Sequence, residues 1–292
     1  MTENRDLSKK VKQLHLVSGK LVESFFAGNY RSVFKGPGLE FDEVREYIAG
    51  DDTRFIDWNV SSRMGSPYTK TFREEREVVL QVLIDISASL GTGAGTVSKQ
   101  DTAGMIFALL AFAAVANNDR VGSLLFSDRI EKQVQPMKGK KHVLKQISQV
   151  LSFKPEGAGS DLSLAFRTTA ETMKRRGICL IISDFRAASY WSELTVLSHR
   201  HDVIAIRVTD PVDRQYPVSG LVELQDPETG ETILGYGRSP RFREEYAEFW
   251  EIERLNWLNG CRRIGVDTLE ISTEDDVAVK LMEYFNRRNK RQ

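Results

Sequence analysis

The fold of this chain is decided by the segment Val78-Val79-Leu80-Gln81-Val82-Leu83-Ile84-Asp85-Ile86-Ser87-Ala88-Ser89-Leu90. Its first seven residues are apolar except for Gln81, and most of them are β-branched or leucine. Such a run is typical of a strand that is buried on both faces, as in the middle of a parallel sheet. The run ends in an acid and two hydroxyls, Asp85, Ser87 and Ser89. We therefore expect a central strand whose carboxyl end carries oxygen ligands, because α/β sheets bind ligands beyond the carboxyl ends of their strands.

Apolar strands and helices alternate along the chain after this segment. Strand patterns cover 121–126, 130–134, 178–182, 203–208 and 268–271, and helical patterns cover 101–117, 143–151, 161–176, 191–199, a long stretch from 240 and the C-terminal residues up to about 288. The alternation predicts an α/β fold, namely a doubly wound, mostly parallel sheet with helices on both faces. Within it, 217–238 reads as a hairpin insertion, because two short strand patterns flank a Pro- and Gly-containing turn.

The first part of the chain differs in character. Leu7, Val11 and Leu14 recur at helical spacing and predict a helix over 5–17, and a Gly- and Pro-containing loop follows. Residues 39–77 are dense in charged and aromatic side chains and have little periodic apolar surface. We therefore expect 1–77 to be an N-terminal extension packed on the main domain, which spans 78–292.

Composition limits the classes of function. The 292 residues include 41 Lys and Arg and 41 Asp and Glu, so there is no basic footprint for nucleic acid. The apolar stretch 105–116 is shorter than the roughly 20 residues of a bilayer span, so we expect a core helix and no membrane span. The N-terminus lacks an apolar signal segment. Cys179 and Cys261 have no metal-ligand spacing, and Cys179 lies in an apolar run as a buried, inert thiol. These features predict a cytoplasmic protein.

Oxygen-bearing side chains stand at three places that the predicted sheet can bring together. Asp85, Ser87 and Ser89 alternate along an extended segment and so point the same way. Ser160 stands in a loop, and Asp184 follows another buried strand. Hard divalent cations such as Mg²⁺ prefer oxygen ligands and keep waters where protein ligands are few. We therefore expect a metal site whose vacant position can accept a carboxylate from a partner.

Structural interpretations of the same residues remain open. The hydroxyls after the central strand can cap the next helix, and Ser160 can cap the helix that starts near Asp161. Asp161 itself is better placed as a cap than as a metal ligand.

The residues resemble known families at this point. The pattern Asp85-x-Ser87-x-Ser89 with Ser160 and Asp184 looks like the metal-ion-dependent adhesion site (MIDAS) of von Willebrand factor A domains. The N-terminal signature is similar to that of the domain-of-unknown-function 58 (DUF58) family, over roughly residues 30–288. It comprises Gly38-Leu39-Glu40-Phe41, Val44-Arg45-Glu46-Tyr47, Gly50-Asp51-Asp52, Arg54-Phe55-Ile56-Asp57-Trp58-Asn59 and Glu74-Glu75-Arg76-Glu77.

The resemblance implies several properties. It implies a von Willebrand factor A-like domain that binds Mg²⁺ (or Mn²⁺ or Ca²⁺) through Asp85, Ser87, Ser89, Ser160 and Asp184. It also implies a MoxR-type AAA+ ATPase as a partner, because such proteins are typically encoded side by side. The family's second loop usually carries Thr, and Ser160 keeps the hydroxyl that a metal would need. Many members carry transmembrane helices, and this sequence is similar to the soluble type.

Three functions follow as hypotheses. The first is a metal-dependent protein-interaction module, not an enzyme, which serves complex assembly or stress-related remodelling and takes an acidic residue of a protein partner. The alternative is a Mg²⁺-dependent phosphohydrolase with Asp85 as nucleophile. Against it, Ser87 stands where a second acid would serve as general acid, and no Lys occupies an obvious phosphate-binding position. The third is a scaffold with a vestigial metal site.

Two further clusters allow two interpretations each. One set forms either a partner-docking face or structural ion pairs and caps: Arg45, Asp51, Asp52, Arg54, Asp57 and Trp58. The other is expected to pack in a core or interface rather than to form a ligand box: Tyr246, Phe249, Trp250 and Trp257. The four histidines lie outside any acid–nucleophile arrangement.

Overall fold

The structure is a computed structural model that describes residues 40–73, 78–91, 95, 97–187, 189–215, 218, 220–225 and 232–290. Residues 40–73 belong to one compact unit and the described residues from Val78 onward belong to another. The predicted helix over 5–17 and the loop after it lie outside the described residues. The packing of the N-terminal extension on the main domain stays a prediction.

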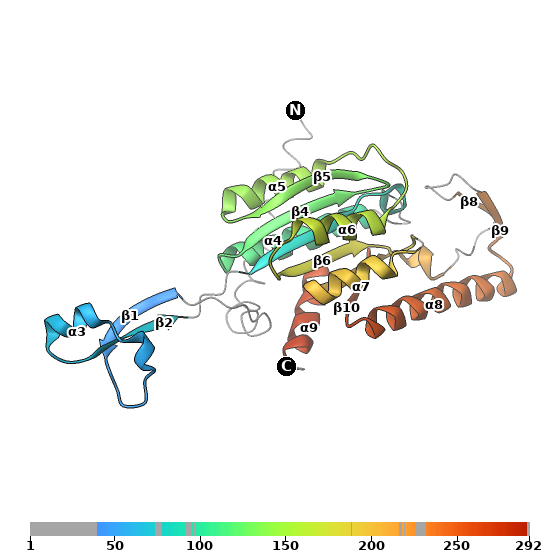
Figure 1. The fold of residues 1–292 in the computed structure, drawn as a ribbon. Helices are drawn as coiled ribbons and strands as arrows, with labels where there is room; N and C mark the ends of the chain where they lie inside the picture. The colour runs from blue at the N-terminus through green and yellow to red at the C-terminus, as the bar shows by residue number, and fades with distance from the viewer. Residues whose placement is uncertain are drawn as a thin grey trace. The chain divides into compact units, whose positions relative to one another are not determined.

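The smaller unit is built on an antiparallel pair of strands, β1 (Glu40–Glu46) and β2 (Tyr68–Arg73). Between them lies the short helix α3 (Trp58–Met64), which begins because the Asp57 carboxylate accepts hydrogen bonds from the backbone N–H groups of Asn59 and Val60. The charged, aromatic stretch whose pattern favoured neither strand nor helix therefore contains both (Figure 1).

The larger unit alternates strands and helices, as the sequence predicts. Its central sheet is formed by β3 (Val79–Asp85), β4 (Arg120–Phe126), β5 (Ile130–Met137), β6 (Ile178–Ser183), β7 (Asp202–Thr209) and β10 (Asp267–Ser272). Its helices are α4 (Lys99–Ala116), α5 (Lys140–Ser152), α6 (Leu162–Thr172), α7 (Trp191–Arg200), α8 (Pro240–Arg263) and α9 (Val277–Asn289). The predicted hairpin is present as β8 (Leu221–Gln225) paired with β9 (Thr232–Tyr236).

The order of the strands indicates where the sheet can form a ligand-binding crevice. The sheet runs β10-β7-β6-β3-β4-β5, and every pair is parallel except β4 with β5, which is an antiparallel edge. From β3 the chain first builds outward through β4 and β5, and then returns to build β6, β7 and β10 on the other side. The reversal lies between β3 and β6, and a crevice opens at such a point in α/β sheets.

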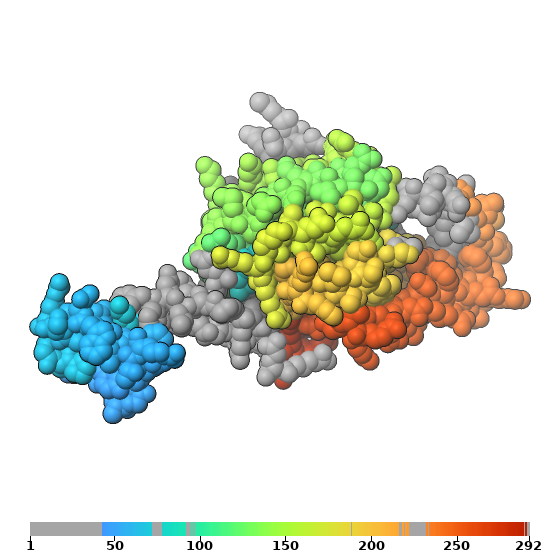
Figure 2. Space-filling model, viewed as in Figure 1, coloured from blue at the N-terminus to red at the C-terminus, as the bar shows by residue number. Residues whose placement is uncertain are grey.

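Helices cover the sheet on two faces, and this confirms the predicted α/β architecture. Side chains of β3, β6 and β7 alternate, so that Leu83, Ile181 and Ala205 share one buried cluster with α6, α7 and α8. Figure 1 shows α6 and α7 in front of the sheet, and in Figure 2 the atoms of α6, α7 and α8 adjoin on the same face. The opposite face packs against α4, which contacts α5 and α9.

Helix α4 is the core helix of the larger unit. It begins with a capping box in which the Ser98 hydroxyl accepts from the Asp101 N–H and the Asp101 carboxylate accepts from the Ser98 N–H. Its length and apolar composition would suffice to cross a membrane, but 72% of it is buried inside the protein. The last helix, α9, is capped by Asp276, whose carboxylate accepts hydrogen bonds from the backbone N–H groups of Ala278 and Val279.

Candidate functional site

The predicted oxygen-bearing residues converge at the reversal point of the sheet. Asp85 is the last residue of β3, and Ser183 and Asp184 end the neighbouring strand β6. The loop that carries Ser160 is tied to the first loop by a backbone hydrogen bond from the Ala88 N–H to the Ala158 carbonyl, 2.8 Å long. Three segments that are far apart in sequence therefore meet beside Asp85.

The Asp85 carboxylate is the centre of this group. Its Oδ1 accepts a hydrogen bond of 2.9 Å from the backbone N–H of Ser87, which bends the chain sharply after the strand. Its Oδ2 accepts from the hydroxyls of Ser160 (2.8 Å) and Ser183 (2.7 Å). The Ser87 and Ser89 hydroxyls lie 3.1 Å apart. A hydroxyl from each loop thus reaches one carboxylate.

Asp184 extends the polar network to the buried ammonium group of Lys99. It accepts a hydrogen bond from the Ser89 side chain, and its Oδ2 lies 3.0 Å from the ammonium of Lys99. The same ammonium lies 3.6 Å from a carboxylate oxygen of Asp213, which also pairs with Arg186 at 2.5 Å. All five predicted residues, Asp85, Ser87, Ser89, Ser160 and Asp184, therefore belong to one connected polar network.

The two carboxylates differ in protonation behaviour because their neighbours differ. Burial and the nearby charge of Asp184 raise the pKa of Asp85 to about 6. Burial also pushes the pKa of Asp184 upward, but the charges of Lys99 and Arg186 outweigh it and hold that pKa below the ordinary value. Among the described residues, therefore, no cationic side chain bonds to Asp85, whereas Asp184 is paired with cations.

Most of the site is buried. Asp85 is fully buried at the end of its strand, and Ser87, Ser89 and Asp184 are buried with it. The hydroxyls of Ser160 and Ser183 donate to the buried carboxylate. Ser160 is the half-buried member of the set.

The donor set fits a hard cation. The possible metal ligands are two carboxylates and several hydroxyls. Within the described residues, no group of three Asp, Glu, His or Cys side chains is placed to hold a metal ion. Oxygen donors of this kind suit Mg²⁺, Mn²⁺ or Ca²⁺. A buried carboxylate whose pKa is raised is also a group that a cation would stabilise.

Sequence reasoning missed two contributors to the site. Ser183 was noted only as the neighbour of Asp184, yet it donates to Asp85 and accepts from the backbone N–H of Phe185. No pattern in the sequence singled out Lys99 as a site residue. It stands in the first turn of α4, where a positive charge interacts unfavourably with the helix dipole. Its burial beside Asp184 explains that position.

The capping alternatives are decided by the observed helix ends. Asp161 caps α6 by accepting from the backbone N–H of Leu164, as preferred over a metal-ligand role. Ser160 is not that cap, and the hydroxyls of the first loop do not cap α4, which begins at Ser98. The hydroxyls of Ser87, Ser89 and Ser160 are thus directed to the acidic network instead.

The other clusters are resolved in part. In the smaller unit, Asp51 pairs with Arg45 (2.8 Å) and Asp52 with Arg54 (2.6 Å), and Asp57 caps α3. These are ion pairs and caps within that unit. Of the aromatic set, Trp257 is buried in the core, whereas Phe249 is largely exposed. Both cysteines are buried free thiols whose pKa values are raised by burial, and the burial of Cys179 was predicted.

Comparison with known proteins gives the family. The family described as "Protein of unknown function DUF58" matches residues 43–255. The chain belongs to the DUF58 family. Uncharacterized protein Rv1480 of Mycobacterium tuberculosis and uncharacterized protein Mb1516 of Mycobacterium bovis are each 28% identical to it over 287 residues, which cover 97% of this chain and 90% of each relative. The predicted resemblance to DUF58 is confirmed.

Solved structures of low identity are also similar in part. An aerotolerance-related membrane protein from Bacteroides fragilis superposes with a TM-score of 0.49 at 14% identity, covering 74% of this DUF58 chain and 100% of that chain. BatB from Bacteroides thetaiotaomicron gives a TM-score of 0.47 at 15% identity and covers 73% of this chain and 99% of that chain.

Proposed function

We propose that this DUF58 protein is a metal-dependent protein-interaction module with a von Willebrand factor A-like site, and that it is not an enzyme. One observation carries the proposal: hydroxyls from three loops and two carboxylates form a single buried network at the reversal point of a parallel sheet. Such a set offers oxygen ligands without a general acid–base pair beside them.

The cation would be held by side chains of this network. Ser87, Ser89 and Ser160 supply hydroxyl oxygens, and Asp85 and Asp184 supply carboxylates that bind directly or through water. Bound Mg²⁺, or Mn²⁺ or Ca²⁺, would offer an open coordination position to a carboxylate of a partner protein. Lys99 neutralises Asp184, so Asp85 supplies the negative charge that remains for the metal.

The partner class follows from the resemblance to the family. We propose a MoxR-type AAA+ ATPase, with a role in complex assembly or stress-related remodelling in the cytoplasm. The balanced charge of 41 basic and 41 acidic residues argues for a protein partner rather than nucleic acid.

A pull-down tests this function. The full chain is incubated with the neighbouring MoxR-type ATPase in Mg²⁺ or in EDTA, using wild type, Asp85→Ala and, as a control, Glu274→Ala, which removes an exposed acid from the β10–α9 loop. We expect capture in Mg²⁺ by wild type and the control, and loss in EDTA or with Asp85→Ala. Equal capture in EDTA would rule out metal dependence, and calorimetric titration with Mg²⁺ and Mn²⁺ measures the metal directly.

The phosphohydrolase alternative is favoured by one observation. Lys99 lies beside the carboxylates of the site, where phosphate-transfer enzymes need a positive charge. Against it, the ammonium is buried between Asp184 and Asp213, and Ser87 stands where the general acid would be. A screen with small phosphate esters decides between them: turnover that disappears in Asp85→Asn supports the enzyme, and no turnover supports the interaction module.

A further inference from the structure

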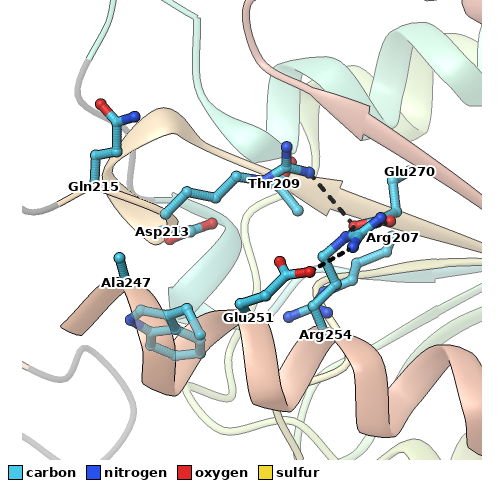
Figure 3. A pocket seen from close by; sticks show the side chains of 10 residues that line it. Arg207, Thr209, Asp213, Gln215, Ala247, Glu251, Arg254 and Glu270 are labelled. Atoms are coloured by element: carbon cyan, nitrogen blue, oxygen red, sulfur yellow. Dashed lines mark hydrogen bonds and ion pairs between the residues drawn. The ribbon is translucent and has the colours of Figure 1, made fainter. Parts of the chain in front are cut away.

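A cavity of about 280 Å³ lies between the end of β7, the strand β10 and the helix α8. Figure 3 shows Arg207, Arg254 and Glu270 close together on one side of it, with Ala247 and Glu251 on α8. Arg207 and Trp250 also line a second cavity of about 300 Å³. These two side chains therefore stand where the two cavities adjoin.

Arg207 is a buried cation whose hydrogen-bonding capacity is unmet. Only 7% of the residue is exposed, and its Nε and NH1 have no hydrogen-bond partner in the described part of the chain. Glu270 stands opposite it in the β7–β10 register, but that carboxylate is bound by Arg254 Nε at 2.8 and 3.0 Å. Arg214 reaches it as well, at 3.4 Å.

The remaining acids of the cavity are also engaged. Asp213 pairs with Arg186 and Lys99 and accepts from the backbone N–H of Asp210. Glu251 pairs with Arg254 at 3.0 Å. Burial lowers the pKa of Arg207, and the acid of Glu270 opposes this without reaching hydrogen-bond distance. No carboxylate in the cavity therefore bonds to the Arg207 guanidinium.

The unmatched groups around Arg207 can all donate. Thr209, two residues further along β7, has a buried hydroxyl without a hydrogen-bond partner among the residues that the structure describes, and within the same residues the buried indole Nε1 of Trp250 has none either. Both residues line the cavity with Arg207. The guanidinium of Arg186 lies 4.2 Å above the Trp250 ring and is paired with Asp213. The lining carries as many acids as arginines, so it is the donors without an acceptor that call for an acceptor-rich group.

A purely structural interpretation leaves these donors unsatisfied. Arg207 lies 5.5 Å from the ring centre of Trp257, a cation–π contact that stabilises the charge. That contact does not supply a hydrogen-bond acceptor, and the N–H groups at Nε and Nη1 still lack one among the described residues. A buried donor without an acceptor is costly, so the chain has a reason to bind one at this place.

We propose that this cavity binds a small organic anion whose carboxylate or phosphate group accepts hydrogen bonds from Arg207. Guanidinium and oxyanion match in geometry and can form two parallel hydrogen bonds. Thr209 and Trp250 add donors, and Ala247 with the Trp250 ring provides an apolar wall for a short hydrocarbon body. The cavity adjoins the Asp85 network through Asp213, which pairs with Lys99 and Arg186, but Arg207 lies outside that network and the proposal does not rest on the function proposed above.

Binding is measured on the full chain by tryptophan fluorescence and calorimetry. The probes are benzoate, succinate, phenyl phosphate and inorganic phosphate, each compared with sodium chloride at equal ionic strength. The first two report a carboxylate site and the last two a phosphate site, and benzoate against succinate reports the apolar wall. The variants are Arg207→Met, which removes the guanidinium but keeps an unbranched apolar side chain, and Thr209→Val, with Arg241→Ala as an arginine control from the exposed side of α8.

We expect at least one organic probe to bind with a dissociation constant of roughly 1 mM or tighter. The affinity should fall about tenfold or more in Arg207→Met, fall less in Thr209→Val and remain unchanged in Arg241→Ala, while thermal unfolding shows that each variant is folded. The proposal is overturned if none of the probes binds more tightly than chloride. It is also overturned if folded Arg207→Met binds as well as wild type.

Discussion

The ammonium of Lys99 lies 3.0 Å from the Asp184 carboxylate, and both side chains are almost completely buried. Lys99 stands at the N-terminal end of α4 and Asp184 follows β6, so the pair joins the core helix to the functional end of the sheet. A buried ion pair gains little over apolar packing, but loss of one partner leaves an uncompensated charge. The pair therefore affects the stability of this region. It also reduces the negative charge of Asp184 that is left to bind a metal cation.

Replacement of Lys99 by Met tests that role. We expect Lys99→Met to lower the free energy of unfolding by about 3 kcal/mol, because Arg186, at the longer distance of 3.7 Å, is then the remaining described cation that pairs with Asp184. A cation can replace the missing ammonium, so Mg²⁺ should stabilise the variant more than it stabilises wild type. Chemical denaturation with and without Mg²⁺ measures both effects.

A lysine from an exposed pair provides the control. Lys280 lies 3.5 Å from Asp275 with both side chains partly exposed, and Lys280→Met should cost under about 1 kcal/mol with no change in the response to Mg²⁺. If Mg²⁺ stabilises Lys99→Met and wild type equally, the ammonium and the metal do not compete for the same charge.

Ser183 supports Asp85 from the neighbouring strand. Its hydroxyl donates to Asp85 Oδ2 at 2.7 Å and accepts from the Phe185 N–H at 2.9 Å. We expect Ser183→Ala to destabilise the protein by about 2 kcal/mol and to weaken Mg²⁺ binding, because both bonded groups stay buried without it. The exposed Ser152, bonded to the carbonyl of Ser148, is the matched control, and Ser152→Ala should leave both measurements near wild type. Unchanged metal affinity in Ser183→Ala would limit the role of the residue to stability.

Features that depend on neighbouring residues could be predicted from the sequence, and features that depend on contacts between distant residues could not. The apolar run of β3 and the alternation after it predicted the sheet, because strands buried on both faces have a distinctive composition. The positions of Asp85 and Asp184 were predictable from strand ends, whereas Ser160 lies in the loop between α5 and α6. Lys99 was not, because its pairing with Asp184 links residues 85 positions apart and its local setting disfavours a cation. The unmet donors of Arg207 depend in the same way on which acids Arg254 and Arg214 occupy.

Gly260 fixes the approach of α8 to α7. A Cβ at this position would overlap the Trp191 ring, whose nearest atoms lie too close for any side chain. We expect Gly260→Ala to destabilise the protein by about 2 kcal/mol despite the better helix propensity of alanine, because overpacking shifts the ring or the helix. The adjacent, exposed Asn259 gives the control, and Asn259→Ala should be neutral or slightly stabilising. Equal thermal unfolding midpoints for the two variants would show that the helices can adjust at no cost.

His201 makes stability depend on pH independently of the metal site. It is 3% exposed, neither ring nitrogen has a hydrogen-bond partner among the described residues, and burial together with the charges of Arg200 and Arg176 lowers its pKa. The unfolded chain therefore takes up a proton before the folded protein does, as pH falls through the ordinary histidine pKa of about 6.5. Stability should be fully present above that pH and decrease below it, until the folded pKa is reached. His201→Phe should flatten this part of the stability profile, whereas His199→Gln, from an exposed position two residues away, should keep it. Urea unfolding between about pH 5 and 8 measures the slope, and an unchanged slope in His201→Phe would assign the dependence to another group.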